Sequence, residues 1–167
     1  MSAKRLTRLA LLTAAALIIF VIEAQLPALA PIPGIKLGLA NVITVWALFA
    51  LSPADAAMIL YARILLGALF AGSAVSLVYS LAGGTLCFLI SLIMRRFVTD
   101  KQIWAVSITG AMAHNIGQLA AASVVMKSAA VFAYAPVLLI SGILTGAFTG
   151  VIAQLIHGRL KDSKLIK

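Results

Sequence analysis

The stretch AVSLVYSLAGGTLCFLISLIMRR, residues 74–96, decides the fold of this chain. No residue from 74 to 94 is charged, and Arg95 and Arg96 follow at once. A run of about 20 apolar residues crosses the ~30 Å hydrocarbon core of a bilayer as one helix. Lys and Arg are enriched at the cytoplasmic ends of such helices. The stretch therefore predicts a membrane-spanning helix that ends on the cytoplasmic side.

Five further apolar runs flank this stretch, each bounded by prolines, glycines or charged residues. They cover residues 6–26, 36–51, 55–71, 103–126 and 135–157. No linker, low-complexity segment or internal repeat separates them. We predict an all-α integral membrane protein, a six-transmembrane-helix bundle that forms a single membrane domain over residues 1–167.

Composition supports the same class. Hydrophobic residues make up 63% of the chain and charged residues only 10%, and the mean hydropathy is +1.15. A soluble domain needs far more charge to cover its surface, so the lipid bilayer is the expected environment. The 13 Lys and Arg residues outnumber 4 acidic ones, but they gather at the ends of apolar runs and form no aromatic-rich basic patch. We therefore expect no nucleic-acid partner.

The basic residues also predict the orientation. They form three groups: Lys4, Arg5 and Arg8; Arg95, Arg96 and Lys101; and Arg159, Lys161, Lys164 and Lys167. With six spans, all three groups fall on one side, which the positive-inside rule makes the cytoplasm. Both termini are then cytoplasmic, and the Pro-rich loop after the first run and the segment 127–134 are external.

The beginning of the chain has some features of a signal peptide. A basic segment precedes the apolar stretch, and Ala28-Leu29-Ala30 has the form of a cleavage site. Pro31 would directly follow the scissile bond, however, and Glu23 interrupts the region before it. We interpret residues 6–26 as a first transmembrane helix.

Small residues at four-residue spacing indicate where helices approach closely. Gly142, Gly146 and Gly150 form such a ridge in the sixth run, and we expect it to pack against another helix of the bundle. Ala10 and Ala14 have the same spacing in the first run. Packing within the chain and docking of a partner are both open for this pair.

Polar side chains within or near the apolar runs form the candidate ligand site, because such groups are costly in a membrane and usually functional. They are Arg63 in the third run, His114, Asn115 and Gln118 in the fifth, and Glu23, Lys36 and Asn41 near the outer ends of the first two runs. We predict that they form the floor and rim of a pocket that opens outward. The surplus of basic groups favours an anionic or polar aromatic ligand.

A purely structural role is the alternative for these residues. Glu23 would then neutralise Lys36 or Arg63, and His114 and Gln118 would bridge helices. Metal binding is not expected, because His114 has no second ligand at suitable spacing and Cys87 is the single cysteine. The sequence has no P-loop, no nucleophile–base pair and no paired Asp motif, so we expect neither enzymatic activity nor a cofactor.

Three motifs together resemble a known family. PGIKLGLAN at 33–41, AHNIGQ at 113–118 and SGILTG at 141–146 are similar to the Gx transporter family, whose members are also named heptaprenyl diphosphate synthase component I. The six-helix plan more distantly resembles the S components of energy-coupling-factor (ECF) transporters. That likeness implies a multi-pass protein of the prokaryotic cytoplasmic membrane.

The resemblance also implies a mechanism and partners. S components bind a micronutrient beneath the loop that joins their first two helices, and dock on a T component driven by two ATPase subunits. The docking face often carries small residues on the first helix, here Ala10 and Ala14. Two alternatives remain: a non-catalytic membrane partner of an isoprenoid or quinone biosynthesis enzyme, and a solitary carrier. The synthase name itself fits poorly, since the acidic residues are scattered.

Overall fold

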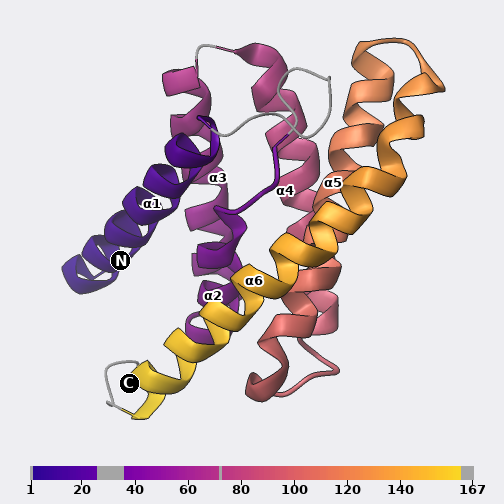
Figure 1. The fold of residues 1–167 in the computed structure, drawn as a ribbon. Coiled ribbons are helices and arrows are strands. Elements are labelled where there is room, and N and C mark those ends of the chain that lie inside the picture. The colour runs from indigo at the N-terminus through magenta and orange to yellow at the C-terminus, as the bar shows by residue number, and fades with distance from the viewer. Residues whose placement is uncertain (1, 26–35, 72, 163–167) are drawn as a thin grey trace.

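The computed structural model describes residues 2–25, 36–71 and 73–162, and Figure 1 shows their fold. They form six α-helices: α1 (Ala3–Glu23), α2 (Asn41–Ala50), α3 (Pro53–Ala71), α4 (Ala74–Met94), α5 (Ile103–Val125) and α6 (Ala135–Asp162). Two short 3₁₀ helices, η1 (Asp100–Gln102) and η2 (Ala129–Tyr134), precede α5 and α6. The described residues include no β-strand, which confirms the predicted all-α class.

Serine caps set two of the helix starts. At α3, the Ser52 hydroxyl accepts a hydrogen bond from the Asp55 amide at 3.1 Å, and Pro53 occupies the first helical position. At α4, the Ser73 hydroxyl accepts one from the Ser76 amide at 3.2 Å. Both caps satisfy amides that have no partner within the helix. The chain can therefore reverse direction over very few residues between these helices.

Within the described residues, four helical segments are long and apolar enough to cross a membrane: Ala3–Glu23, Pro53–Phe70, Ala74–Met94 and Ala129–Lys161. α5 is also long, at 23 residues, but it carries His114, Asn115 and Gln118 and is enclosed between α4 and α6. These properties are those of a membrane protein. The count of six spans remains a prediction, because it depends on α2 and α5.

The second helix differs most from the prediction, which was wrong for its start: α2 begins at Asn41 instead of residue 36. Gly38 has a φ of +81°, in the left-handed region that interrupts a helix and favours glycine. With 10 residues, α2 is about 15 Å long, roughly half of a bilayer core. The preceding residues, 36–40, are non-helical and lead directly into α2.

The other helix bounds differ from the predicted runs by a few residues. α1 ends at Glu23 instead of residue 26, and α6 continues to Asp162 instead of ending at 157. The predicted Pro-rich loop and the candidate cleavage site fall largely on residues 26–35, which lie outside the described residues.

The glycine ridge of α6 packs against α5, as predicted. A Cβ atom added to Gly146 would lie 2.7 Å from the Ile108 Cα, and one added to Gly150 would lie 2.6 Å from the Trp104 Cα. Distances this short leave no room for a side chain, so the two backbones are in direct contact. Figure 1 shows α6 lying along α5 over much of its length.

Contacts between helix ends show that successive helices alternate in direction. Arg5 of α1 pairs with Asp55 of α3 at 2.7 Å, and the ring of Phe49 at the end of α2 lies 6.4 Å from that of His157 near the end of α6. Lys161 of α6 contacts Asp100, just before α5, at 2.6 Å. The described members of the three basic groups are thus gathered at one end of the bundle, called here the basic end. Its cytoplasmic location remains a prediction.

Candidate functional site

Six of the seven predicted ligand-binding residues form one connected group, called here the polar network. Its members are Glu23, Lys36, Asn41, Arg63, His114 and Gln118. They come from α1, α2, α3, α5 and the non-helical residues before α2. All except Lys36 have an exposed fraction of 6% or less. The network lies in the half of the bundle opposite the basic end, since Glu23 ends α1 and Asn41 begins α2.

A chain of hydrogen bonds crosses the centre of the network. Nη2 of Arg63 donates to Oδ1 of Asn41 at 2.9 Å. Nδ2 of Asn41 lies 3.2 Å from Nδ1 of His114, within hydrogen-bond distance. One amide side chain at the start of α2 therefore links α3 to α5, and it provides a polar partner for a buried guanidinium group.

The non-helical residues before α2 are held by two side chains of the network. The Gly38 amide donates to Oε1 of Glu23 at 2.5 Å, and the Lys36 amide donates to Oε1 of Gln118 at 3.3 Å. Within a membrane, backbone that is neither helix nor sheet needs such partners. Nζ of Lys36 lies 3.5 Å from the centre of the Phe20 ring, a cation–π contact.

Two glycines allow the polar side chains to pack this closely. A Cβ atom on Gly38 would lie 2.9 Å from both Nδ2 of Asn41 and Cδ2 of His114. A Cβ atom on Gly83 of α4 would lie 2.9 Å from Nδ1 of His114. Sequence reasoning did not assign Gly38, Gly83 or Phe20 to the site. Gly38 stands inside the motif PGIKLGLAN, and this was the signal that could have identified it.

The structural alternative for Glu23 is met only in part. Among the described residues, its carboxylate forms no ion pair with Lys36 or Arg63, although both are close enough to attract it electrostatically. It accepts hydrogen bonds from the backbone amides of Gly38 and Ala40 instead. Glu23 therefore acts on the backbone before α2, and Arg63 depends on a neutral amide for its hydrogen bond.

Asn115 is the predicted site residue that the fold does not bring into the polar network. Its Nδ2 donates to the carbonyl oxygen of Leu138 in α6, and a Cβ atom on Gly142 would lie 2.8 Å from the same nitrogen. Because neighbouring residues of a helix point about 100° apart, Asn115 faces α6 while His114 faces α2 and α4.

Three nitrogen atoms of the network have no hydrogen-bond partner within the described part of the chain. They are Nε of Arg63, Nε2 of His114 and Nε2 of Gln118. Buried polar groups are nearly always paired, and an unpaired one costs about 1–3 kcal/mol. Three such atoms in one network are the kind of feature that a ligand-binding site contains. The described residues include no group of three potential metal-binding side chains.

The predicted docking residues, Ala10 and Ala14, lie on the exposed side of α1. They line an apolar groove of about 450 Å³ between α1 and α3, together with Leu6, Leu9, Thr13, Leu17, Met58, Ala62 and Leu66. Arg5 and Asp55 close one end of this helix pair with their ion pair. The groove has the shape and composition to take an apolar helix or a lipid chain.

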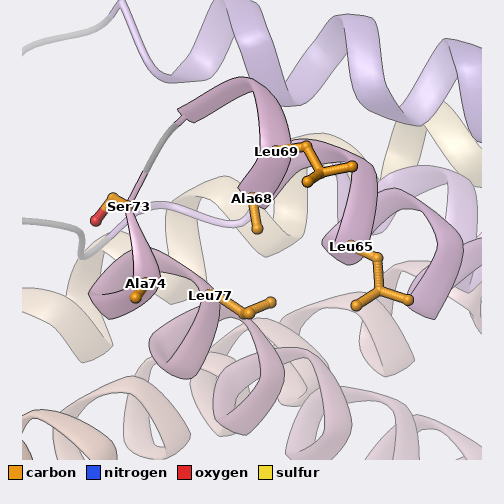
Figure 2. A pocket seen from close by; sticks show the side chains of 6 residues that line it. All are labelled: Leu65, Ala68, Leu69, Ser73, Ala74 and Leu77. Atoms are coloured by element: carbon orange, nitrogen blue, oxygen red, sulfur yellow. The ribbon is translucent and has the colours of Figure 1, made fainter.

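A second apolar pocket lies where α3 meets α4, and Figure 2 shows it from close by. It has a volume of about 320 Å³, and the side chains of Leu65, Ala68, Leu69, Ser73, Ala74 and Leu77 line it. Ser73 supplies the polar atom among these side chains, and its hydroxyl already caps α4. This pocket does not include the polar network, so it is not the predicted ligand site.

Comparison with known proteins identifies a family. No curated protein and no solved structure matches the chain. The family model described as heptaprenyl diphosphate synthase component I matches residues 12–156, a range that includes every member of the polar network. Since this range is most of the chain, the protein belongs to the heptaprenyl diphosphate synthase component I family.

Proposed function

We propose that this protein is the ligand-capturing membrane subunit of a micronutrient uptake transporter, similar in its role to an ECF S component. It would act in the prokaryotic cytoplasmic membrane as a multi-pass protein. The observation that carries the proposal is the polar network, in which the buried Arg63, His114 and Gln118 each have a nitrogen without a partner among the described residues. A small polar ligand that paired with these nitrogens would remove the cost of leaving them unsatisfied.

The position of the network suggests the route of entry. The network lies opposite the basic end, which the positive-inside rule makes cytoplasmic, so a ligand would arrive from outside. Residues 36–40 cover His114 on this path, and Gly38 directly contacts its ring. Two side-chain hydrogen bonds hold these residues. Their displacement would expose His114 and Gln118, and their return would enclose the ligand.

Partner subunits would supply the energy for uptake. The sequence has no P-loop, so ATP hydrolysis would take place in other chains. The apolar groove beside Ala10 and Ala14 suits docking of a T component, because small exposed residues let two helix backbones approach closely. The complete transporter would then contain this chain, a T component and two ATPase subunits.

The proposal is tested by purifying the protein in mild detergent and identifying the small molecules that remain bound by mass spectrometry. We expect one retained compound, which Arg63→Gln and His114→Ala should each lose while expression and melting temperature stay near wild type. The matched control is His157→Ala, which changes the other histidine, at the basic end. If the wild type retains nothing, or if both network variants retain as much as the control, ligand capture at this site is wrong.

A second function is favoured by the family itself. The name heptaprenyl diphosphate synthase component I suggests a subunit that assists a prenyl diphosphate synthase. In that case the chain would be a non-catalytic membrane partner. Isolation of the native protein under gentle conditions separates the two functions: a soluble prenyl synthase in the complex favours this one, and T and ATPase subunits favour the transporter.

A further inference from the structure

The hydrogen bonds at the centre of the polar network have a defined direction. An Arg guanidinium group can only donate hydrogen bonds. The group that faces Arg63 in Asn41 must therefore be the carbonyl oxygen, Oδ1. The amide nitrogen Nδ2 then faces His114, and since it can only donate, Nδ1 of His114 is the acceptor.

The contact with Asn41 indicates the tautomer of His114, although the ring also has a hydrogen-bond contact with the Gly83 backbone that favours a ring N–H. A neutral imidazole has one protonated and one unprotonated ring nitrogen, and the unprotonated one accepts. With Nδ1 as the acceptor, the proton lies on Nε2. This nitrogen has no partner within the described protein, so it is a free N–H donor.

The same reasoning applies to the other two unpaired atoms. Oε1 of Gln118 accepts from the Lys36 amide, so its free nitrogen, Nε2, is a donor. Nε of Arg63 is a donor in every state. All three unpaired nitrogens of the network therefore carry hydrogen. Glu23, the acid of the network, accepts from the Gly38 amide.

We propose that the ligand presents an anionic acceptor group, a carboxylate or a phosphate, to Arg63, His114 and Gln118, and that neutral amides and cations do not bind there. This inference rests on the proposed function and selects among the ligand classes that the sequence left open. Acceptor oxygens match three N–H donors, and charged hydrogen bonds are about twice as strong as neutral ones. Arg63 forms no ion pair within the described residues, although Glu23 lies close enough to attract it, so an anionic ligand would give the guanidinium group a direct charged partner.

The first test examines the tautomer and needs no ligand. The chain contains two histidines, so ¹⁵N-histidine labelling gives two imidazole patterns, and His157→Ala removes one of them. We expect His114 to show a protonated Nε2 and an unprotonated Nδ1 in two-dimensional ¹H–¹⁵N spectra of the protein in nanodiscs. A protonated Nδ1 with an unprotonated Nε2 would overturn the proposal, because His114 would then offer an acceptor to the ligand.

The second test compares probes of matched shape in phosphatidylcholine nanodiscs. Benzoate and phenyl phosphate should shift the His114 Nε2 resonance and raise the melting temperature, and benzamide and benzylamine should do neither. Arg63→Gln should weaken benzoate binding about tenfold or more, the usual effect of losing one charged hydrogen bond. The variant His157→Ala should bind as the wild type does. Equal binding of benzamide, or no binding of either anion, would overturn the proposal.

Two further results locate the anion and separate this inference from the proposed function. If phosphatidylglycerol nanodiscs give the same His114 shift without any probe, the anion is a lipid headgroup; if they do not, it is a free solute. A retained natural compound that is neutral would leave the proposed function standing and remove this inference. If no compound is retained and no probe binds, both are wrong.

Discussion

The buried guanidinium group of Arg63 donates a hydrogen bond to Oδ1 of Asn41 at 2.9 Å, and this contact ties the middle of α3 to the first residue of α2. The other side of the Asn41 amide reaches His114 of α5. A short helix that begins at a non-helical segment has few backbone contacts to fix its start. Asn41 supplies one through its side chain, so it serves both the fold and the polar network.

Asn41→Ala should therefore destabilise the protein as well as disturb the site. It leaves Arg63 and His114 without their shared partner, and an unsatisfied buried polar group costs about 1–3 kcal/mol. We expect a drop of this size in the free energy of unfolding, measured by denaturant titration in detergent. Thr145→Val is the control, since the Thr145 hydroxyl donates to the carbonyl oxygens of Ser141 and Gly142 in its own helix. An equal effect of both variants would contradict a special role for Asn41.

Gly146→Leu should lower the melting temperature in detergent. Even a Cβ atom at this position would lie 2.7 Å from the backbone of α5, so a larger side chain must force α5 and α6 apart. Overpacking of this kind typically costs about 1–3 kcal/mol. Gly158→Leu is a matched control on the same helix, because nothing lies within 4 Å of a Cβ atom there. If both variants melt alike, the close packing of α6 on α5 does not contribute to stability.

The extent of the helices followed from simple features of the sequence. Uncharged runs bounded by prolines, glycines and charged residues located α3, α4 and α5 to within two residues, because each is a local feature. The start of α2 could not be found in this way. The segment before it is apolar enough to be helical. The structure alone shows that Gly38 has a positive φ and lies against the ring of His114.

The polar network was predictable for a different reason. Polar side chains are rare in an apolar chain, so Arg63, His114 and Gln118 stood out, and burial brought them together. Asn115 lies outside the network because one step along α5 turns it toward Leu138. Gly83 contacts His114 and Phe20 contacts Lys36 only because of how α4 and α1 pack in the bundle. An apolar sequence does not reveal this packing.

Asp100 should make stability depend on pH. The hydrogen bond from Lys161, with the charges of Lys161 and His157, holds the pKa of Asp100 below its ordinary value of 3.8. Because the pKa of Asp100 is lower in the folded state than in the unfolded state, the charged carboxylate stabilises the fold at pH values above the unfolded-state pKa. This stabilisation is lost as the pH falls through the folded-state pKa. Because solvent screens this half-exposed side chain, Asp100→Asn should cost about 0.2–1 kcal/mol near pH 7. The difference from wild type should shrink as the pH falls below 3.8, as unfolding curves would show; a constant difference would contradict this.

The predicted orientation can be tested with single cysteines. Lys127 and Lys101 are both exposed and lie at opposite ends of α5. In a Cys87→Ala background, Lys127→Cys should react with a membrane-impermeant thiol reagent in intact cells, and Lys101→Cys should react only after permeabilisation. The positive-inside rule is the reason, since Lys101 belongs to a basic group. Reaction of Lys101→Cys alone in intact cells would reverse the orientation.

Docking through the groove beside α1 should be sensitive to the size of residue 14. Ala14 is exposed and lines the apolar groove with Ala10, so Ala14→Leu would fill part of it while keeping the surface apolar. We expect this variant to lose co-purification with T and ATPase subunits and to keep its bound ligand, because the polar network lies elsewhere in the bundle. Ala120→Leu makes the same change at an exposed alanine of α5 and should keep the partners. If both variants retain the partners, this groove is not the docking face. If Ala14→Leu loses the ligand, α1 has shifted, because Glu23 at the end of this helix accepts a hydrogen bond from the Gly38 amide.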